Sequence, residues 1–260
     1  MTNKPIVSVI TPLYNSELFI EKTMQSVKHQ SFQNWEMILI DDCSSDSSLQ
    51  LATELANADQ RFRIISLSEN SGAAVARNTG IEAALGRYIA FLDSDDVWLP
   101  NKLQKQLKFM QKNELAFSCG AYRKVNERGE FLDIARPPVK VDYKSTLKTP
   151  RIGCLTAMYD TEITGKVYMP LIRKRQDFGL WLRLLKKVDF VHGIQEPLAE
   201  YLVRSDSISA SKASAAKYTW RIYREEEGFG LIKSFYYFFN YAIRNGLRSK
   251  APKLAKLLSI

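Results

Sequence analysis

Apolar residues in the first 115 positions form short β-branched runs that alternate with longer stretches where they recur every three or four residues. The first kind of segment is typical of buried strands, and the second is typical of helices that cover a sheet. We predict strands at residues 6–11, 35–41, 63–67 and 88–92, and helices at 16–30, 73–85 and 100–112. This alternation predicts an α/β fold with a Rossmann-like, mostly parallel sheet and helices on both faces.

Capping residues agree with these boundaries. Pro100 suits a first helical turn, and Ser44 or Ser45 can cap a helix after the second strand. Gly72 and Gly86 flank the alanine-rich helix, and Gly86 is expected to end it.

The pattern is less regular from residue 116 onward. A hairpin is predicted at residues 126–130, a turn at the two prolines 137 and 138, and amphipathic helices at 178–187 and 214–227. We therefore interpret residues 1–115 and 116–227 as two halves of one domain, followed by a C-terminal helical segment at 228–260.

Composition narrows the class of protein. The chain has 260 residues, of which 45% are hydrophobic and 25% charged, as expected for a globular domain. It contains no apolar run of about 20 residues that could span a membrane, and its N-terminus does not resemble a secretory signal. The three cysteines are odd in number and lack metal-ligand spacing, so a reducing, cytoplasmic location is predicted.

Charge is distributed unevenly along the chain. The net charge is +9, but residues 1–100 hold 7 basic and 13 acidic side chains, whereas residues 101–260 hold 30 basic and 15 acidic ones. Such a difference suggests that the two parts face different partners. A nucleic-acid partner fits the charge, but no base-reading module is present.

Three polar clusters follow predicted strands, at residues 12–15, 41–42 and 93–96. In open parallel sheets, ligands bind beyond the carboxyl ends of the strands. The cluster at 93–96 holds three carboxylates within four positions, and a divalent ion such as Mg²⁺ or Mn²⁺ would relieve their repulsion. A solvated helix N-terminus explains the same spacing equally well.

Four motifs decide between these readings. They are Val7-Ser-Val-Ile-Thr-Pro-Leu-Tyr-Asn15, Ile40-Asp-Asp-Cys-Ser-Ser-Asp46, Asn70-Ser-Gly-Ala-Ala-Val-Ala-Arg-Asn78 and Phe91-Leu-Asp-Ser-Asp-Asp96. In this order and spacing the chain resembles the inverting family 2 glycosyltransferases with the GT-A fold, and among them the bacterial enzymes that build lipopolysaccharide, capsule or teichuronic acid. The resemblance is dense through residue 112 and continues to about residue 227. It implies a hexosyltransferase with a nucleotide-sugar-binding half at 1–115 and an acceptor-binding half at 116–227.

The resemblance also implies a donor site. Pro12 and Tyr14 lie in the segment that contacts the nucleotide base, Tyr14 packs on that base, and Asp42 accepts a hydrogen bond from its imide, which favours a UDP-sugar donor. Arg77 lies where the family contacts the donor. Without the motif context, Tyr14 would be read as a partly buried core residue and Arg77 as a surface charge.

The acidic cluster receives two roles from the same resemblance. Asp93 approaches the ribose or the sugar, and Asp95 holds Mg²⁺ or Mn²⁺ on the diphosphate.

A catalytic acid is implied in the second half, at the start of a helix. The segment Arg175-Gln-Asp-Phe-Gly-Leu-Trp181 matches this position, so Asp177 is the predicted general base. Asp177 could also simply cap that helix. The basic residues 173–175 could face phosphates, although a solvated charge run is the commoner explanation.

One segment departs from the family pattern. Members often carry a Tyr-Arg-x-His-like segment before a Ser-x-Ser, whereas here Leu202 and Arg204 occupy the arginine and histidine places. A histidine ligand to the metal is therefore not expected, and Arg204 could contact the diphosphate. His29 and His192 are predicted to be structural.

The C-terminal segment combines aromatic and basic residues. Residues 228–260 hold six Lys or Arg and no acid, after a dense aromatic run at 235–241. This composition fits a helix lying in the interface of an anionic membrane, and a core helix packed on the acceptor half is the competing interpretation. With a lipid-diphosphate-linked saccharide as the acceptor that the resemblance implies, we expect the enzyme to lie at the inner face of the plasma membrane.

Other classes fit less well. A catalytically silent GT-A domain that serves as an assembly factor would have no need to keep Asp42, Asp93, Asp95 and Asp177 together. A processive synthase would need membrane spans and a Gln-x-x-Arg-Trp motif, and a dinucleotide oxidoreductase would need Gly-x-Gly-x-x-Gly after the first strand.

Overall fold

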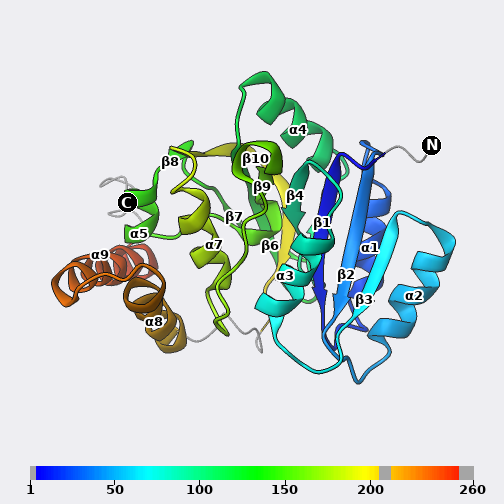
Figure 1. The fold of residues 1–260 in the computed structure, drawn as a ribbon, viewed down its shortest axis with the longest axis horizontal. Helices are drawn as coiled ribbons and strands as arrows, with labels where there is room; N and C mark the ends of the chain where they lie inside the picture. The colour runs from blue at the N-terminus through cyan, green and yellow to red at the C-terminus, as the bar shows by residue number, and fades with distance from the viewer. Residues whose placement is uncertain (1–3, 205–211, 252–260) are drawn as a thin grey trace.

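A twisted sheet with helices on both faces forms the body of the molecule (Figure 1). The computed structural model describes residues 4–204 and 212–251. The strands follow the spatial order β3-β2-β1-β4-β9-β6-β10-β5, with β7 paired to β6 and β8 paired to β10. Their bounds are β1 Val7–Leu13, β2 Trp35–Asp41, β3 Phe62–Ser66, β4 Tyr88–Phe91, β5 Val97–Trp98, β6 Phe117–Val125, β7 Phe131–Ala135, β8 Lys140–Val141, β9 Met158–Asp160 and β10 Val191–Leu202.

The strands β1 to β4 are parallel, and their register brings the predicted polar clusters to one edge. Leu13 at the end of β1 is level with Asp41 at the end of β2, and the amide of Leu92 donates to the carbonyl of Ile10 at 3.1 Å. Since carboxyl ends of parallel strands meet at the same edge, the residues after β1, β2 and β4 are neighbours there.

Helices cover both faces of this sheet because each presents an apolar side to it. One core joins α1, α2 and α4 to the sheet, and the other joins α3 and α7 to the opposite face. The helix bounds are α1 Ile20–Lys28, α2 Ser48–Ala58, α3 Ala73–Ala83, α4 Lys102–Lys112, α5 Tyr143–Lys148, α6 Thr161–Thr164, α7 Gln176–Leu184, α8 Lys212–Arg221 and α9 Leu231–Lys250.

The second half of the chain extends the same sheet. The strand β9 is antiparallel to both β4 and β6, whereas β10 is parallel to β6. The short strand β5, from the first half, pairs with β10 at the far edge. The chain after β4 therefore crosses over to the acceptor half.

Helices α8 and α9 lie at the opposite end of the molecule from β3 and α2 (Figure 1). A π-helical turn, Ile222–Glu226, follows α8 directly. A third apolar core joins this region to α5 and α7, and it includes Leu147, Phe178, Tyr223 and Tyr237. Residues 231–250 form the helix expected in the C-terminal segment, and one side of that helix packs on α5 and α7.

Several local predictions were wrong. The helix after the second strand is not capped by Ser44 or Ser45, because it begins at Ser48 and the amide of that residue donates to Asp46 at 3.0 Å. The helix α3 ends at Ala83 rather than at Gly86. Gly86 instead lies against β1, where a Cβ would come within 2.7 Å of the amide nitrogen of Ser8.

The predicted hairpin is confirmed, since β6 and β7 pair antiparallel and the carbonyl of Asn126 accepts from Gly129 at 2.9 Å. The strands β6, β9 and β10 were not predicted, because the pattern of apolar residues is irregular after residue 116. The helix predicted at 214–227 is α8 followed by the π-helical turn.

Candidate active site

The loop after β1 is fastened to the loop after β2. Asn15 has a positive φ of 45°, and its side-chain oxygen accepts from the amide of Ser45 at 2.8 Å. Its own amide donates to the Ser44 hydroxyl at 3.2 Å. Tyr14, which follows Pro12 and Leu13, is 51% exposed at this edge. An aromatic face is therefore open beside the ends of β1 and β2, where the sequence predicts a nucleotide base.

Asp42 organises the loop that leads into α3. Its two carboxylate oxygens accept hydrogen bonds from the amides of Ser71, at 2.6 Å, and Gly72, at 2.8 Å. The Asp42 carbonyl accepts from the side chain of Asn70 at 2.9 Å. Gly72 has φ +89°, which L side chains rarely adopt, so glycine suits this position. The second acid of the pair is thus a structural anchor, and its predicted contact with a base would use the remaining lone pairs of the same oxygens.

Arg77 on α3 forms an ion pair with Asp93, the first residue of the acidic cluster. The arginine is buried, with 7% of its surface exposed, whereas the Asp93 side chain is 34% exposed. Burial is the largest single effect and lowers the pKa of Arg77, but the charge and hydrogen bond of Asp93, together with the charges of Cys154 and Asp177, raise the pKa overall. Without its motif context, Arg77 would be interpreted as a charge on the helix surface. Its burial and its ion pair with Asp93 exclude that interpretation.

The two other acids of the cluster differ in exposure. The Asp95 side chain is 32% exposed and lies 3.6 Å from Arg204, which follows β10. Burial and then the charge of Asp93 raise the pKa of Asp95, and Arg204 partly offsets that rise. Asp96 is buried and accepts from the amide of Leu202 at 3.1 Å. Burial, followed by the charges of Asp93 and Asp95, raises the pKa of Asp96 well above its usual range.

Sequence reasoning missed the role of Asp96, which fastens the end of β10 to the acidic cluster. Through this bond Arg204 is held opposite Asp95, with its guanidinium 4.8 Å from the Phe19 ring. In the sequence, Asp96 is marked only as a third carboxylate after an apolar strand. That position does not indicate its hydrogen-bond partner Leu202, which lies 106 residues away. Residues 205–209 of the Ser-x-Ser segment lie outside the described residues.

Asp177 is the second residue of α7, and it is half-buried. The residue that precedes the helix, Arg175, is left-handed with φ 64°. The charge of Asp177 contributes to raised pKa values at Tyr122 and Cys154, where burial is the largest cause. The charge of Asp177 also contributes to the raised pKa of Arg77, so the predicted base lies near enough to act on the arginine that pairs with Asp93.

Tyr122 lies on β6, and Cys154 begins the short 3₁₀-helix Cys154–Thr156. Burial raises the pKa of Tyr122 to about 12, and Tyr201 and Asp96 add to the effect. The rings of Tyr122 and Tyr201 are 5.9 Å apart between centroids. Nothing in the sequence marked these residues, because their roles depend on pairing between β6 and β10.

The acids at residues 93–96 fit a metal ion that binds together with a phosphate-bearing ligand. Among residues 4–204 and 212–251, no group of three His, Cys, Asp or Glu side chains is arranged to hold a metal ion by itself. Asp93 is paired with Arg77, Asp96 accepts a hydrogen bond from the amide of Leu202, and Asp95 faces Arg204 at the longer distance of 3.6 Å, so Asp95 is the least tightly held of the three acids. Mg²⁺ sites commonly use one or two carboxylates with substrate phosphates and water. The donor set therefore fits such an ion only when a diphosphate completes it.

The two histidines lie apart from this cluster. His29 follows α1, and its ring nitrogen Nδ1 is 2.9 Å from the carbonyl of Gln25. His192 lies on β10 beside Phe190, and burial lowers its pKa. The three cysteines, Cys43, Cys119 and Cys154, are free thiols.

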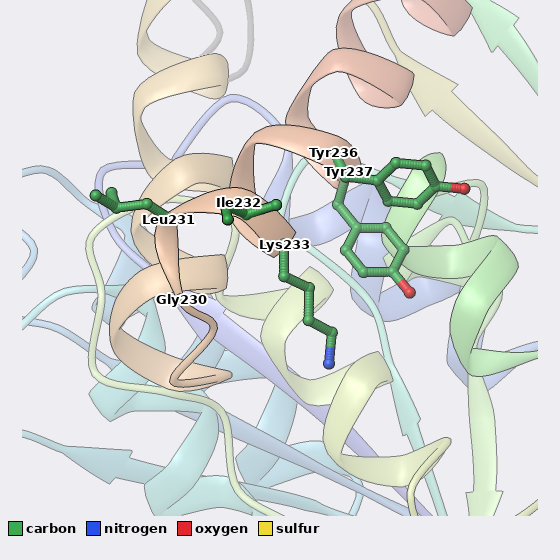
Figure 2. Close-up of a pocket in the computed structure, with 6 residues that line it drawn as sticks. All are labelled: Gly230, Leu231, Ile232, Lys233, Tyr236 and Tyr237. Carbon is green, nitrogen blue, oxygen red and sulfur yellow. The ribbon is translucent and has the colours of Figure 1, made fainter.

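A separate hollow of about 780 Å³ lies on the first turns of α9, away from the strand ends. Figure 2 shows Lys233 and the rings of Tyr236 and Tyr237 extending to one side of the helix, and Leu231 extending to the other. No helix within the described ranges is long and apolar enough to cross a membrane.

The sheet order and the helices on both of its faces define a fold of the GT-A type. Solved structures with this fold include the first 349 residues of Staphylococcus aureus TarS in complex with UDP, with a TM-score of 0.70 and 21% identity over 98% of this chain and 75% of that one. Another is the mannosyltransferase PcManGT from Pyrobaculum calidifontis in complex with GDP-Man and Mn²⁺, with a TM-score of 0.68 and 17% identity over 99% of this chain and 80% of that one. At such identities the likeness establishes the fold.

Sequence comparisons establish the family. The glycosyl transferase family 2 model matches residues 8–160, and the chain belongs to this family. It is 48% identical, over 96% of this chain and 100% of the relative, to a Bacillus subtilis (strain 168) protein whose name assigns it to teichuronic acid biosynthesis as glycosyltransferase TuaG. It is 35% identical, over 92% of each chain, to the Escherichia coli enzyme named UDP-Glc:alpha-D-GlcNAc-diphosphoundecaprenol beta-1,3-glucosyltransferase WfgD. The protein is thus a glycosyltransferase, as the sequence motifs predicted.

Proposed function

We propose that this glycosyltransferase moves a sugar from a UDP-sugar to a hydroxyl of a lipid-diphosphate-linked saccharide, with inversion at the anomeric carbon. The observation that supports this proposal is the ion pair between the buried Arg77 and Asp93 beyond the strand ends, together with the charge of Asp177 that acts on the same arginine. The named activity of WfgD and the UDP bound to TarS support the donor and the acceptor class.

On the donor side, Tyr14 stacks on the uracil and Asp42 accepts a hydrogen bond from its imide N–H. Pro12 shapes the strand end from which Tyr14 extends. Arg77 and Asp93 contact the ribose and sugar, and Asp93 remains placed by its buried arginine partner. Asp95 would hold Mg²⁺ or Mn²⁺ on the diphosphate, and such an ion would supply positive charge that stabilises the leaving UDP.

On the acceptor side, Asp177 acts as the general base. It takes the proton from the acceptor hydroxyl while that oxygen forms a bond to the anomeric carbon. The bond from the anomeric carbon to the phosphate oxygen breaks at the same time, and UDP departs with the electron pair. One displacement of this kind inverts the configuration.

The exposed side of α9 is proposed to lie on the inner surface of the plasma membrane. Its exposed apolar residues are Leu231, Ile232, Phe235, Tyr236, Phe239 and Ile243, and basic residues accompany them without any acid from residue 228 onward. Apolar side chains beside basic ones favour the interface of an anionic bilayer. The opposite side of α9 packs on the acceptor half, so the two interpretations made from the sequence apply to different sides of one helix. Lys253 and Lys256 of this segment lie outside the described residues.

Calorimetric titration of UDP, with Mn²⁺ and then with EDTA, tests the donor site. We expect UDP to bind only with the metal, Asp95→Ala to abolish that binding, and Asp177→Ala to leave it intact. Absence of metal-dependent binding of UDP to the wild-type protein would count against the uracil and metal assignments together. A silent GT-A domain would then be the better proposal if turnover of UDP-sugars were also undetectable.

A further inference from the structure

Four arginines gather where the C-terminal part of α9 meets the loop before α7. Arg175 donates a hydrogen bond from Nη2 to the hydroxyl of Tyr241 at 3.1 Å, and its guanidinium lies 5.9 Å from the centroid of that ring. Tyr241, Arg244 and Arg248 follow one another at spacings of three and four residues, so they share one side of α9. The arginine cluster comprises Arg151, Arg175, Arg244 and Arg248.

Arg151 joins the cluster from the loop between α5 and the 3₁₀-helix. Burial, and then the nearby charges of Arg151 and Arg244, lower the pKa of Arg248 to about 10. Burial also lowers the pKa of Arg151. The positive charges of Arg151 and Arg244 thus act on Arg248, and such repulsion costs free energy unless an anion lies nearby.

The cluster has no acidic partner within the part of the chain that the structure describes. No ion pair is formed there by Arg151, Arg244 or Arg248, and the buried Nε of Arg248 has no hydrogen-bond partner. Buried donors are nearly always satisfied, so an unsatisfied guanidinium nitrogen points to a group absent from the protein itself. Guanidinium groups bind phosphate oxygens with two parallel hydrogen bonds, which makes phosphate the fitting ligand.

The position of the arginine cluster indicates which phosphate-bearing molecule it binds. Arg175 stands two residues before Asp177, and its left-handed backbone, with φ 64°, is strained for a residue other than glycine. The charge of Asp177 acts on Cys154, which lies three residues after Arg151. On the far side of α9, Phe235 and Phe239 are exposed. The cluster thus lies between the apolar side of α9 and the predicted base.

We infer that the arginine cluster binds the diphosphate that links the acceptor saccharide to its lipid. This inference rests on the proposed function for the acceptor class. The lipid chain would lie along the apolar side of α9, the diphosphate at the arginines, and the sugar hydroxyl at Asp177. The cluster would then set the distance between the membrane and the reacting hydroxyl.

The test uses the full chain with Arg244→Gln and Arg248→Gln combined. A matched control combines Lys187→Gln and Lys217→Gln, which removes two exposed positive charges near the same helices but outside the cluster. Binding is measured by flotation with phosphatidylcholine vesicles, alone, with a small fraction of polyprenyl diphosphate, or with phosphatidylglycerol. We expect the arginine variant to lose about tenfold in affinity for the polyprenyl diphosphate vesicles, since charge-assisted hydrogen bonds are lost. Phosphatidylglycerol binding should fall equally in the two variants.

Two outcomes would overturn the inference. Equal losses for both variants on polyprenyl diphosphate vesicles would indicate general charge attraction. A selective loss on phosphatidylglycerol would identify a lipid headgroup as the ligand instead.

Titration of UDP with Mn²⁺ in each variant shows whether the donor half is folded. If the glutamine variant does not fold, the combined variant Arg244→Lys and Arg248→Lys replaces it. If the wild-type protein bound the diphosphate vesicles through the cluster but never bound UDP, the proposed function would fail while the anion site remained.

Discussion

The donor half and the acceptor half of the site differ in how their charged groups are satisfied. In the donor half, Asp42 accepts two backbone hydrogen bonds, Asp93 pairs with Arg77, and Asp96 binds the amide of Leu202. In the acceptor half, no hydrogen bond or ion pair between described residues involves the Asp177 carboxylate, and the arginine cluster has no acid beside it.

This difference indicates which side is built before the substrates arrive. A group fixed by protein partners is preorganised and costs little to order when a ligand binds. A group without partners obtains its interactions only from the substrate. Relatives could therefore share a donor site while differing in acceptor, because the acceptor side depends on a few charges that the protein itself does not pair.

The largest effect is expected from Asp177→Asn. The amide cannot accept the proton from the acceptor hydroxyl, so kcat should fall by about 10²–10⁴-fold while the affinity for UDP stays within a factor of about two. Steady-state kinetics and UDP titration measure both quantities. A parallel loss of UDP affinity would show that Asp177 belongs to the donor half, and the contrast between the halves would disappear.

Asp93→Asn should destabilise the protein, because it leaves the buried Arg77 guanidinium without its counter-charge. We expect a loss of about 2 kcal/mol in the free energy of unfolding, below the value for a fully buried pair since the Asp93 side chain is 34% exposed. Urea denaturation gives the number, and Asp133→Asn, at an exposed position on β7, provides the control. If both variants unfolded at the same urea concentration, the prediction would be wrong, and water would have to supply the hydrogen bonds of the Arg77 guanidinium.

Asp42→Asn replaces one accepting oxygen with an NH₂ group that faces an amide donor. The loop at residues 70–72 should loosen, with a loss of about 1–2 kcal/mol in stability. Hydrogen exchange should show faster exchange at the amides of Ser71 and Gly72. Unchanged protection of these two amides would contradict the anchoring role that their bonds to Asp42 indicate.

The smallest effect is expected from Gly72→Ala. No atom lies within 4 Å of the added Cβ, so only the backbone strain at φ +89° matters. This strain should cost about 1 kcal/mol and lower Tm by a few degrees. Thermal unfolding compared with Gly129→Ala, at φ +77° in the β6–β7 turn, tests whether strain beside the donor site acts differently from strain in a remote hairpin.

The four motifs in the first 96 residues indicated the family and the expected donor-side residues, because each motif begins in a strand or in the loop that follows one. Periodicity sufficed for β1 to β4, since they alternate with helices along the chain. Periodicity failed for β6, β9 and β10. In the sheet, β6 lies between β9 and β10, whereas along the chain more than one helix separates β9 from β10. Their partners are distant in sequence, and local patterns carry no information about such pairing.

The sequence by itself determined the class of enzyme and the identity of the acids, because short motifs fix both which side chains are present and which strand ends carry them. Only the tertiary structure decided what each acid does when no substrate is bound. The bond from Asp96 to Leu202, the burial of Arg77 beneath Asp93, and the meeting of Arg151 and Arg175 with α9 all join residues far apart in the chain. Electrostatic interactions depend on distance and burial in space, and both arise only when the chain folds.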